Sequence, residues 1–274
     1  MKILLTFLFF FINTDAYSAS LFQIESQKGD EQSLGVGFFV NNEGVALTSY
    51  HVVENSSVIL ARINHVVYNV EILGFDEVYD IALLKVDITN KDYYQTAAKQ
   101  KFLLGDAVKI DSIVGDQNGK IVQEEDHQFM VDIDIAQGFS GSPVLCNSFV
   151  CGVVVSLDTE TNHAIVAKSS GFMQNYDAMM NGGALRKKNI GLYVMDLTKD
   201  AIITLGFDFS KKPHGVLVTY SQNNKLKSWD VITHVDNIEI YNVEELQNAI
   251  MKKYENDIIT FQVVRNKIPE TVTI

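Results

Sequence analysis

Residues 34–160 contain a series of short apolar runs, and this series constrains the fold more than any other feature of the sequence. Each run has about the length of a β-strand, and Gly, Asn or Asp stands between consecutive runs. The first two runs, 36–40 and 45–48, flank Asn41-Asn42-Glu43-Gly44, which is typical of a hairpin turn. The later runs are 57–63, 66–73, 81–86, 107–114, 119–122 and 129–135. Their even spacing predicts an all-β barrel or sandwich.

The pattern changes after these runs. Residues 169–180 carry apolar side chains at helical spacing, and Gly182-Gly183 is a typical helix end. Arg186-Lys187-Lys188 then reads as a linker to a second unit with strands near 192–196, 215–220, 230–235 and 258–264. The sequence therefore predicts two domains, 21–184 and 185–274.

The second unit has one well-marked helix, from Val243 to about Lys253. Asn242 is the expected N-cap, and Glu245 stands at the position that completes a capping box. Val243, Leu246 and Ile250 form the apolar stripe of this helix.

Composition excludes several classes of protein. The 274 residues are 47% apolar and 20% charged, which is globular and neither disordered nor collagen-like. With 22 basic and 34 acidic residues the net charge is −12, so nucleic acid is not an expected partner. The two cysteines are too few for a disulfide-framework miniprotein or a zinc site of four thiolates.

Residues 1–20 are typical of a secretory signal peptide. Lys2 supplies the positive charge, an apolar run over 3–12 follows, and small residues at 16 and 18–20 favour cleavage after Ser18 or Ser20. The apolar run is about half of the ~20 residues that span a bilayer. We therefore expect a periplasmic or secreted protein, and the alternative is an uncleaved membrane anchor.

The two cysteines suit an oxidising compartment. Cys146 and Cys151 flank residues 147–150, between apolar runs at 143–145 and 152–155. Two strands joined by a tight turn would bring the sulfurs opposite each other. The sequence therefore predicts a hairpin disulfide, with modest stabilisation because the closed loop is short.

Three separate segments carry residue types that suit nucleophilic catalysis. His51 follows the strand-like run 45–48, Asp80 precedes the apolar run 81–86, and Ser140 lies in the glycine-rich turn 138–143. A serine hydroxyl needs a base to remove its proton, and a carboxylate can orient a histidine for that task. The glycines allow backbone N–H groups to face a developing oxyanion. Each segment alone also has an ordinary structural explanation, but their chain order and their places at strand ends favour one common site.

Taken together, these segments resemble trypsin-like serine proteases, and most closely the HtrA (Do-like) family of bacterial envelope proteases. The matching residues are 35–38, 47–53, 80–85 and 138–143. The resemblance implies a mostly β fold with a trypsin-like double β-barrel. It also implies that His51 is the general base, Asp80 its orienting carboxylate and Ser140 the nucleophile. The N–H groups of Gly138 and Ser140 would form the oxyanion hole.

The sequence departs from the family pattern at three positions. Phe139 stands where Asn is common, Ser142 where Gly is common, and Tyr50 where a small or polar residue is usual. Phe139 and Tyr50 are the main support for an alternative from another class, a chaperone-like binding protein that is catalytically weak or inactive.

Asp134 bears on specificity, because it precedes Ser140 by the interval at which trypsin places the carboxylate of its primary pocket. Buried there, it would pair with Arg or Lys of a substrate. The alternative is a loop aspartate that points to solvent or accepts hydrogen bonds from nearby backbone.

The second unit resembles a bacterial PDZ domain, an α+β fold that follows HtrA proteases. Ile190-Gly191-Leu192 matches the loop that receives a peptide's C-terminal carboxylate, and 192–196 would be the edge strand that pairs with the peptide. Leu246 and Ile250 would face the groove. Residues 221–228 are fewer than usual, which predicts that a small helix is reduced or missing, and Trp229 stands where Gly is common. The alternative is a degenerate PDZ domain that serves packing or assembly.

These features predict a secreted or periplasmic serine endopeptidase that degrades unfolded or misfolded proteins, with PDZ recognition of C-termini. A narrow-specificity secreted protease is a further alternative. The resemblance also suggests homo-oligomers, specifically trimers. No metal or organic cofactor is expected, since His127 and His163 lack the spacing of ligands.

Overall fold

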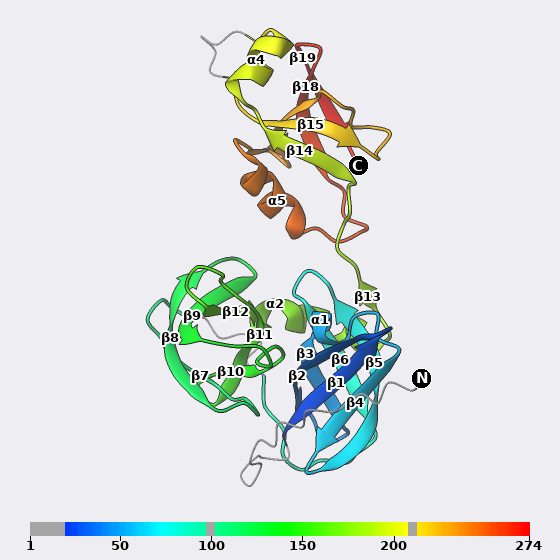
Figure 1. Ribbon diagram of the computed structural model, residues 1–274, viewed down its shortest axis with the longest axis vertical. Helices are drawn as coiled ribbons and strands as arrows, with labels where there is room; N and C mark the ends of the chain where they lie inside the picture. Colours follow the sequence, from blue (N-terminus) through cyan, green and yellow to red (C-terminus); the bar gives the residue numbers. More distant parts are fainter. Residues whose placement is uncertain (1–19, 97–101, 208–212) are drawn as a thin grey trace, which may run out of the picture. The chain divides into compact units, whose positions relative to one another are not determined.

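The computed structural model describes residues 20–96, 102–207 and 213–274. Except for its last residue, the predicted signal peptide lies outside the described residues. The chain forms two compact units, one ending at Ala184 and the other beginning at Leu185 (Figure 1).

The first six strands close into an antiparallel barrel in the order β5-β4-β1-β2-β3-β6, because β5 pairs with both β4 and β6. Phe22, Phe39 and Leu84 are fully buried in its core. The hairpin predicted at 41–44 is confirmed: the Asn41 Oδ1 accepts the N–H groups of Glu43 and Val45. A short strand, β13, continues the sheet beside β5. The elements are β1 (Leu21–Lys28), β2 (Glu31–Phe39), β3 (Val45–Ser49), α1 (Tyr50–Val53), β4 (Val58–Ile63), β5 (Val66–Asp76), β6 (Ile81–Val86) and β13 (Ala184–Leu185).

A second antiparallel barrel follows, closed in the order β10-β11-β12-β9-β8-β7. Phe129, Val144 and Val166 are among its buried core residues. The trypsin-like double barrel predicted from the resemblance is therefore confirmed. The strands are β7 (Ala107–Ile110), β8 (Gln117–Glu124), β9 (Gln128–Asp134), β10 (Pro143–Cys146), β11 (Phe149–Leu157) and β12 (His163–Lys168).

The helical segment after the second barrel is broken into three short pieces rather than one continuous helix. These are α2 (Ser169–Phe172), the 3₁₀ turn η1 (Met173–Asn175) and α3 (Tyr176–Met180). Phe172 and Met179 are fully buried. The apolar spacing thus identified the buried face correctly but not the 3₁₀ turn.

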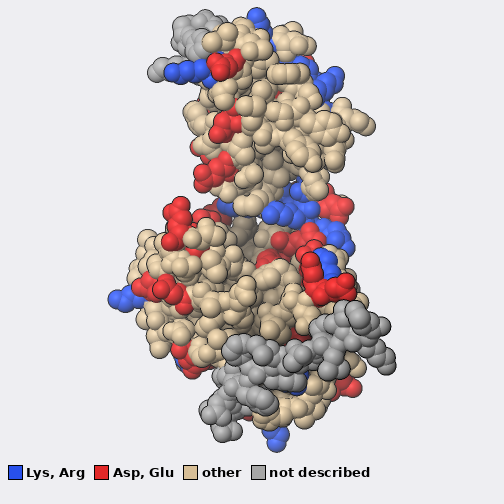
Figure 2. Space-filling view, in the orientation of Figure 1, with Lys and Arg blue, Asp and Glu red and all other residues tan. Residues whose placement is uncertain are grey.

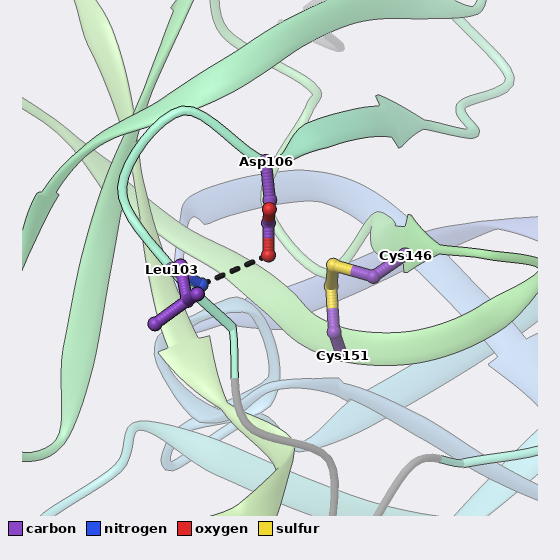
Figure 3. Close-up of a disulfide and its surroundings, with 4 residues drawn as sticks. All are labelled: Leu103, Asp106, Cys146 and Cys151. Atoms are coloured by element: carbon purple, nitrogen blue, oxygen red, sulfur yellow. Dashed lines mark hydrogen bonds between the residues drawn. A yellow bond between two sulfur atoms is a disulfide. The ribbon is translucent and has the colours of Figure 1, made fainter.

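Cys146 and Cys151 form a disulfide across the β10–β11 hairpin (Figure 3). The turn residues Asn147 and Ser148 both have positive φ, of 51° and 69°. That pair of conformations is the one favoured in two-residue hairpin loops, since it matches the twist of the strands. Figure 3 also shows the turn before β7, in which Asp106 accepts the N–H of Leu103.

The second unit is a five-strand antiparallel sheet in the order β14-β15-β16-β18-β19, with β17 pairing to β16, and two helices. Ile232, Ile259 and Phe261 are fully buried in its core. The predicted helix is α5, capped by the Asn242 side chain, which accepts the N–H of Glu245. The elements are β14 (Leu192–Asp196), α4 (Lys199–Leu205), β15 (Val216–Ser221), β16 (Val231–Val235), β17 (Ile238–Glu239), α5 (Val243–Met251), β18 (Thr260–Arg265) and β19 (Ile268–Thr273).

Residues 186–188 and Trp229 of the second unit can now be compared with the expectations from the sequence. The expected linker is wrong: the Lys188 N–H donates to Lys253 O, and Glu255 N–H donates to Arg186 O, so 186–188 is fastened to the turn after α5. Trp229 has a φ of 76°. A left-handed conformation is easiest for glycine, the residue that the resemblance led us to expect there.

No helix within the described ranges is long and apolar enough to span a membrane. Acidic side chains are spread over the visible face of the two barrels (Figure 2), in keeping with the net charge of −12.

Candidate active site

His51 and Asp80 come together in the first barrel. His51 lies in α1, directly after β3, and Asp80 directly precedes β6, which pairs with β3. His51 Nδ1 lies 2.5 Å from Asp80 Oδ2, and the His51 backbone N–H donates to Asp80 Oδ1 at 2.8 Å. The Tyr50 N–H donates to the Asp80 backbone carbonyl. These contacts fix both the ring and the carboxylate, and they leave Nε2 as the ring nitrogen that can act on a substrate or a hydroxyl.

The environment of His51 favours its protonated form. Partial burial lowers the pKa of His51, but the hydrogen bond to Asp80 and the charges of Asp80 and Glu54 outweigh burial, so the pKa is raised above 6.5. A carboxylate that stabilises an imidazolium is what a general base requires when it accepts a proton.

Ser140 lies in a turn whose backbone conformation depends on glycine. Gly138 and Gly141 have φ of 99° and 86°, in the left-handed region. A Cβ on Gly141 would lie 2.0 Å from the carbonyl oxygen of Val36 and 2.4 Å from Thr48 Oγ1. The absence of a side chain therefore lets the turn approach β2 and β3 of the first barrel closely.

Backbone hydrogen bonds hold the Ser140 turn beside the helix that carries His51. The Val36 N–H donates to the carbonyl of Ser140 at 2.8 Å. A Cβ on Gly35 would lie 2.8 Å from the methyl groups of Val52 and 2.9 Å from the Ser140 carbonyl oxygen. Gly35 is thus in close contact both with Val52, the residue after His51, and with Ser140. Because Asp80 contacts His51, the three predicted catalytic residues lie in one region.

The turn is also joined to β11 and β3. The Gly141 N–H and the Ser49 hydroxyl both donate to the carbonyl of Val154, and the Val154 N–H donates to the carbonyl of Ser142. Ser49 directly precedes α1 and is fully buried. Sequence reasoning missed this role of Ser49, whose only signal was its place beside the histidine.

Three polar groups of the turn have no hydrogen bond with any other described residue: the N–H groups of Gly138 and Ser140, and the Ser140 hydroxyl. Ser140 itself is half-buried. These groups include the two N–H donors predicted for the oxyanion hole.

The unusual residues beside the site are core residues. Phe139 is buried in the core of the second barrel. Tyr50 is buried in the first, with its ring stacked on Phe75 at a centroid distance of 4.2 Å. Ser142, where glycine is common, is fully buried. The two bulky departures therefore fill the barrel interiors.

Asp134 is at the end of β9, and its side chain is 80% exposed. The ring nitrogen Nε2 of His163 lies 3.9 Å from Asp134 Oδ1. The buried primary-pocket carboxylate that the alignment with trypsin predicted does not fit this exposure, because water would screen the charge. The exposure favours the alternative of a solvent-facing aspartate.

The residues predicted for peptide binding gather at one edge of the second unit. β14 is an edge strand, and Gly191, with φ of 65°, directly precedes it. Ile190 and Leu246 belong to the same core cluster, and Leu192 and Ile250 pack against it half-buried. The Gly191 N–H donates to the Asn189 side chain at 2.9 Å.

A double barrel whose histidine, aspartate and serine lie on these loops defines the trypsin-like class of fold. Two family models match the chain in agreement with this description: a trypsin-like peptidase domain over residues 35–157 and a PDZ domain over residues 204–274. The chain thus has a trypsin-like peptidase domain followed by a PDZ domain.

Curated relatives match most of this chain at low identity. A probable periplasmic serine endoprotease DegP-like of Marinomonas sp. is 22% identical over 92% of this chain and 58% of its own length. The protein of the same name from Chlamydia muridarum is 24% identical over 87% of this chain and 54% of its own. The chain therefore spans a little over half the length of these relatives.

Solved structures share the fold over nearly the whole chain. The HtrA-type protease AlgW with decapeptide has a TM-score of 0.67 at 16% identity and covers 93% of this chain and 94% of its own. The serine endoprotease from Yersinia pestis has a TM-score of 0.64 at 18% identity, with 93% of each chain covered.

Proposed function

We propose that the protein is a serine endopeptidase in which Ser140 is the nucleophile, His51 the general base and Asp80 the carboxylate that orients it. The observation that carries the proposal is the contact of His51 Nδ1 with Asp80 Oδ2 at 2.5 Å, on a helix beside the Ser140 turn. The names of the relatives, serine endoproteases, support the same reaction.

The proposed chemistry uses these three side chains in turn. His51 Nε2 removes the proton of the Ser140 hydroxyl as the oxygen attacks a peptide carbonyl, and Asp80 stabilises the resulting imidazolium. The N–H groups of Gly138 and Ser140 donate to the oxyanion that forms. His51 then protonates the leaving amine, and an acyl-enzyme on Ser140 remains.

Deacylation uses the same residues a second time. Water replaces the leaving amine, His51 removes its proton, and a second tetrahedral intermediate collapses to release the new C-terminus. Apart from the substrate and this water, every group that these steps use belongs to the chain.

The location and the substrates belong to the same proposal. The relatives are named periplasmic, and the sequence begins with a segment typical of a secretory signal. We infer a periplasmic or secreted enzyme that cuts unfolded or misfolded proteins. The PDZ domain would bind C-termini by strand addition at β14, with Ile190, Gly191 and Leu192 around the carboxylate and Leu246 and Ile250 around the last side chain.

The alternative of a non-proteolytic binding protein loses its main support. Phe139 and Tyr50 suggested it because they are bulky beside the proposed site, but both are buried in the barrel cores. Neither gives a reason for the hydroxyl and the imidazole to be inactive.

Degradation of a denatured protein tests the proposal. The full chain should convert reduced, alkylated albumin to peptides, leave folded albumin largely intact, and respond to an added peptide with a free apolar C-terminus. The Ser140→Ala variant is the matched control, because it folds from the same backbone and lacks only the hydroxyl. Equal degradation by both proteins, or none by either under all conditions with peptide, contradicts the proposal.

A further inference from the structure

Tyr79, the residue before Asp80, reaches from the first barrel to the second. Its hydroxyl lies 2.7 Å from Nδ1 of His127, and the two rings pack edge to face at 4.9 Å. His127 directly precedes β9 of the second barrel. The proposed base-orienting carboxylate therefore follows a side chain that is anchored on the opposite barrel.

The place of the Tyr79 ring is set by a glycine. A Cβ on Gly171, in α2, would lie 2.3 Å from both Cε1 and the hydroxyl oxygen of Tyr79. The fully buried Phe172 packs against the other part of the ring at a centroid distance of 6.5 Å. The ring thus occupies space that only a residue without a side chain leaves open.

The same turn is anchored a second time at its start. Asp76 is fully buried, and its Oδ1 accepts the N–H groups of Val78 and Tyr79. Its Oδ2 accepts a hydrogen bond from the Asn175 side chain, in η1, at 2.7 Å. Asp76 and Tyr79 are therefore both held by elements that follow or belong to the second barrel.

This anchoring matters because Asp80 has a strained backbone. Its φ is 56°, in the left-handed region that non-glycine residues rarely adopt. Such a conformation persists only where the surroundings determine it. Tyr50 and His51 hold Asp80 directly from the first barrel, and the contacts of Asp76 and Tyr79 hold the residues before it.

We propose that Tyr79 and His127 are positioning residues for the site: their hydrogen bond transmits the position of the second barrel to Asp80 and so fixes the His51–Asp80 pair. Ser140 belongs to the second barrel and His51 to the first. The side-chain link between the barrels is made by Tyr79, next to Asp80. It keeps His51 aligned with Ser140, which comes from the other barrel. The inference rests on the proposed function for its catalytic consequence, although the positioning itself does not depend on it.

The Tyr79 hydroxyl is protonated near neutral pH. Burial, Asp76 and Asp126 raise the pKa of Tyr79 to about 12. The hydroxyl can therefore donate to His127 Nδ1 or accept from it, according to the tautomer of the ring. The groups that face His51, in contrast, are Asp80 and Glu54.

The test is an NMR titration of the His51 ring in the full chain, with its signal assigned by comparison with His51→Ala. Tyr79→Phe keeps the ring but removes the hydroxyl, and His127→Leu removes the hydrogen-bond partner of Tyr79. We expect either change to lower the pKa of His51 by roughly 0.5 unit, because a loosened Asp80 loses part of the one to three units that a close carboxylate contributes. His127→Asn places an acceptor near the position of Nδ1 and should restore most of the wild-type value.

Kinetics on a peptide substrate complete the test. We expect kcat to fall about 3- to 10-fold in Tyr79→Phe and His127→Leu with KM nearly unchanged, since misplacement of a catalytic group costs rate rather than binding. Tyr68→Phe is the matched control, because the Tyr68 hydroxyl has no hydrogen bond with another described residue.

The two proposals fail in different ways. Shifted pKa values without any peptidase activity in the wild type contradict the proposed function and support the positioning. If the His51 pKa in both Tyr79→Phe and His127→Leu equals that of the wild type, the positioning proposal is overturned. It is also overturned if kcat falls equally in His127→Asn and His127→Leu. A merely destabilised protein loses active fraction but does not shift the pKa of the remaining folded molecules.

Discussion

The two barrels have the same number of strands and the same closed antiparallel arrangement, yet they hold their parts of the site by different means. The first barrel fixes His51 and Asp80 through side-chain hydrogen bonds. The second fixes Ser140 through backbone hydrogen bonds and glycines. We call His51 and Asp80 the first half of the site and the Ser140 turn the second half. Activity should therefore be sensitive to changes of side-chain chemistry in the first half, and to any side chain added to a glycine in the second half.

The strongest test of the first half is Asp80→Asn. An amide in this place cannot stabilise the imidazolium and favours the wrong tautomer of His51, so kcat/KM should fall on the order of 10³- to 10⁴-fold near neutral pH. Initial rates on a chromogenic peptide measure it. Asp134→Asn is the matched control: this exposed carboxylate should leave the rates unchanged, for Arg-containing peptides as well as apolar ones. A large loss of Arg cleavage in Asp134→Asn revives the basic pocket.

Gly141→Ala tests the second half. The added Cβ would lie 2.0 Å from the Val36 carbonyl oxygen, so the Ser140 turn has to move away from the first barrel. A displacement of this kind should reduce kcat about 10²-fold. Gly105→Ala is the control, since Gly105 also has positive φ but open space around it. It should keep its activity and lose about 1 kcal/mol of stability. Similar activity in both variants contradicts the close approach of the barrels.

The pH dependence of kcat/KM tests the electrostatics of the first half. The active base is neutral His51, and its raised pKa means that protonation begins at higher pH, so activity should fall as pH drops, with a midpoint above 6.5. Glu54→Gln removes one of the charges that raise the pKa and should move the acid limb to lower pH by a few tenths of a unit. A midpoint at or below 6.5 in the wild type argues against the Asp80 contact in solution.

Removal of the disulfide should have the smallest effect on the site. Cys146→Ala with Cys151→Ala opens a short loop in the second barrel, which should lower the free energy of unfolding by about 2 kcal/mol. Ser140 is held by β2 and β11 rather than by this hairpin turn, so kcat at moderate temperature should change less than twofold. Urea unfolding and rates on the same preparation give both values. A large rate loss in fully folded protein shows that the hairpin also shapes the site.

Much of the fold was predictable because its signals are local. The hairpins at 41–44 and 147–148 and the cap at Asn242 depend on residues next to one another in the sequence. β12 was missed, although residues 163–168 form a full barrel strand, because no turn signal of the expected kind separates it from the helical pattern. β1 was missed because it begins where the predicted signal peptide ends. α4 carried a readable signal, the Thr198 N-cap and Gly206, that sequence reasoning did not use.

The candidate site divides in the same way. His51, Asp80 and Ser140 were identifiable because their motifs are contiguous. Ser49, Asp76 and Tyr79 were not, because their partners Val154, Asn175 and His127 are distant in the chain and only the folded barrels bring them close. Asp134 shows a different limit of the sequence. Its interval to Ser140 suggested a position in the primary pocket, but the interval could not predict the direction of the side chain, which is exposed.

The most direct test of the central claim is to react the full chain with a fluorophosphonate and locate the adduct by peptide mass spectrometry. We expect one stoichiometric adduct on Ser140, absent from Ser140→Ala and strongly reduced in His51→Ala, because only a serine activated by a neighbouring imidazole reacts rapidly. An unmodified wild type, or the same adduct on another residue in Ser140→Ala, contradicts the claim that these three segments form one nucleophilic site.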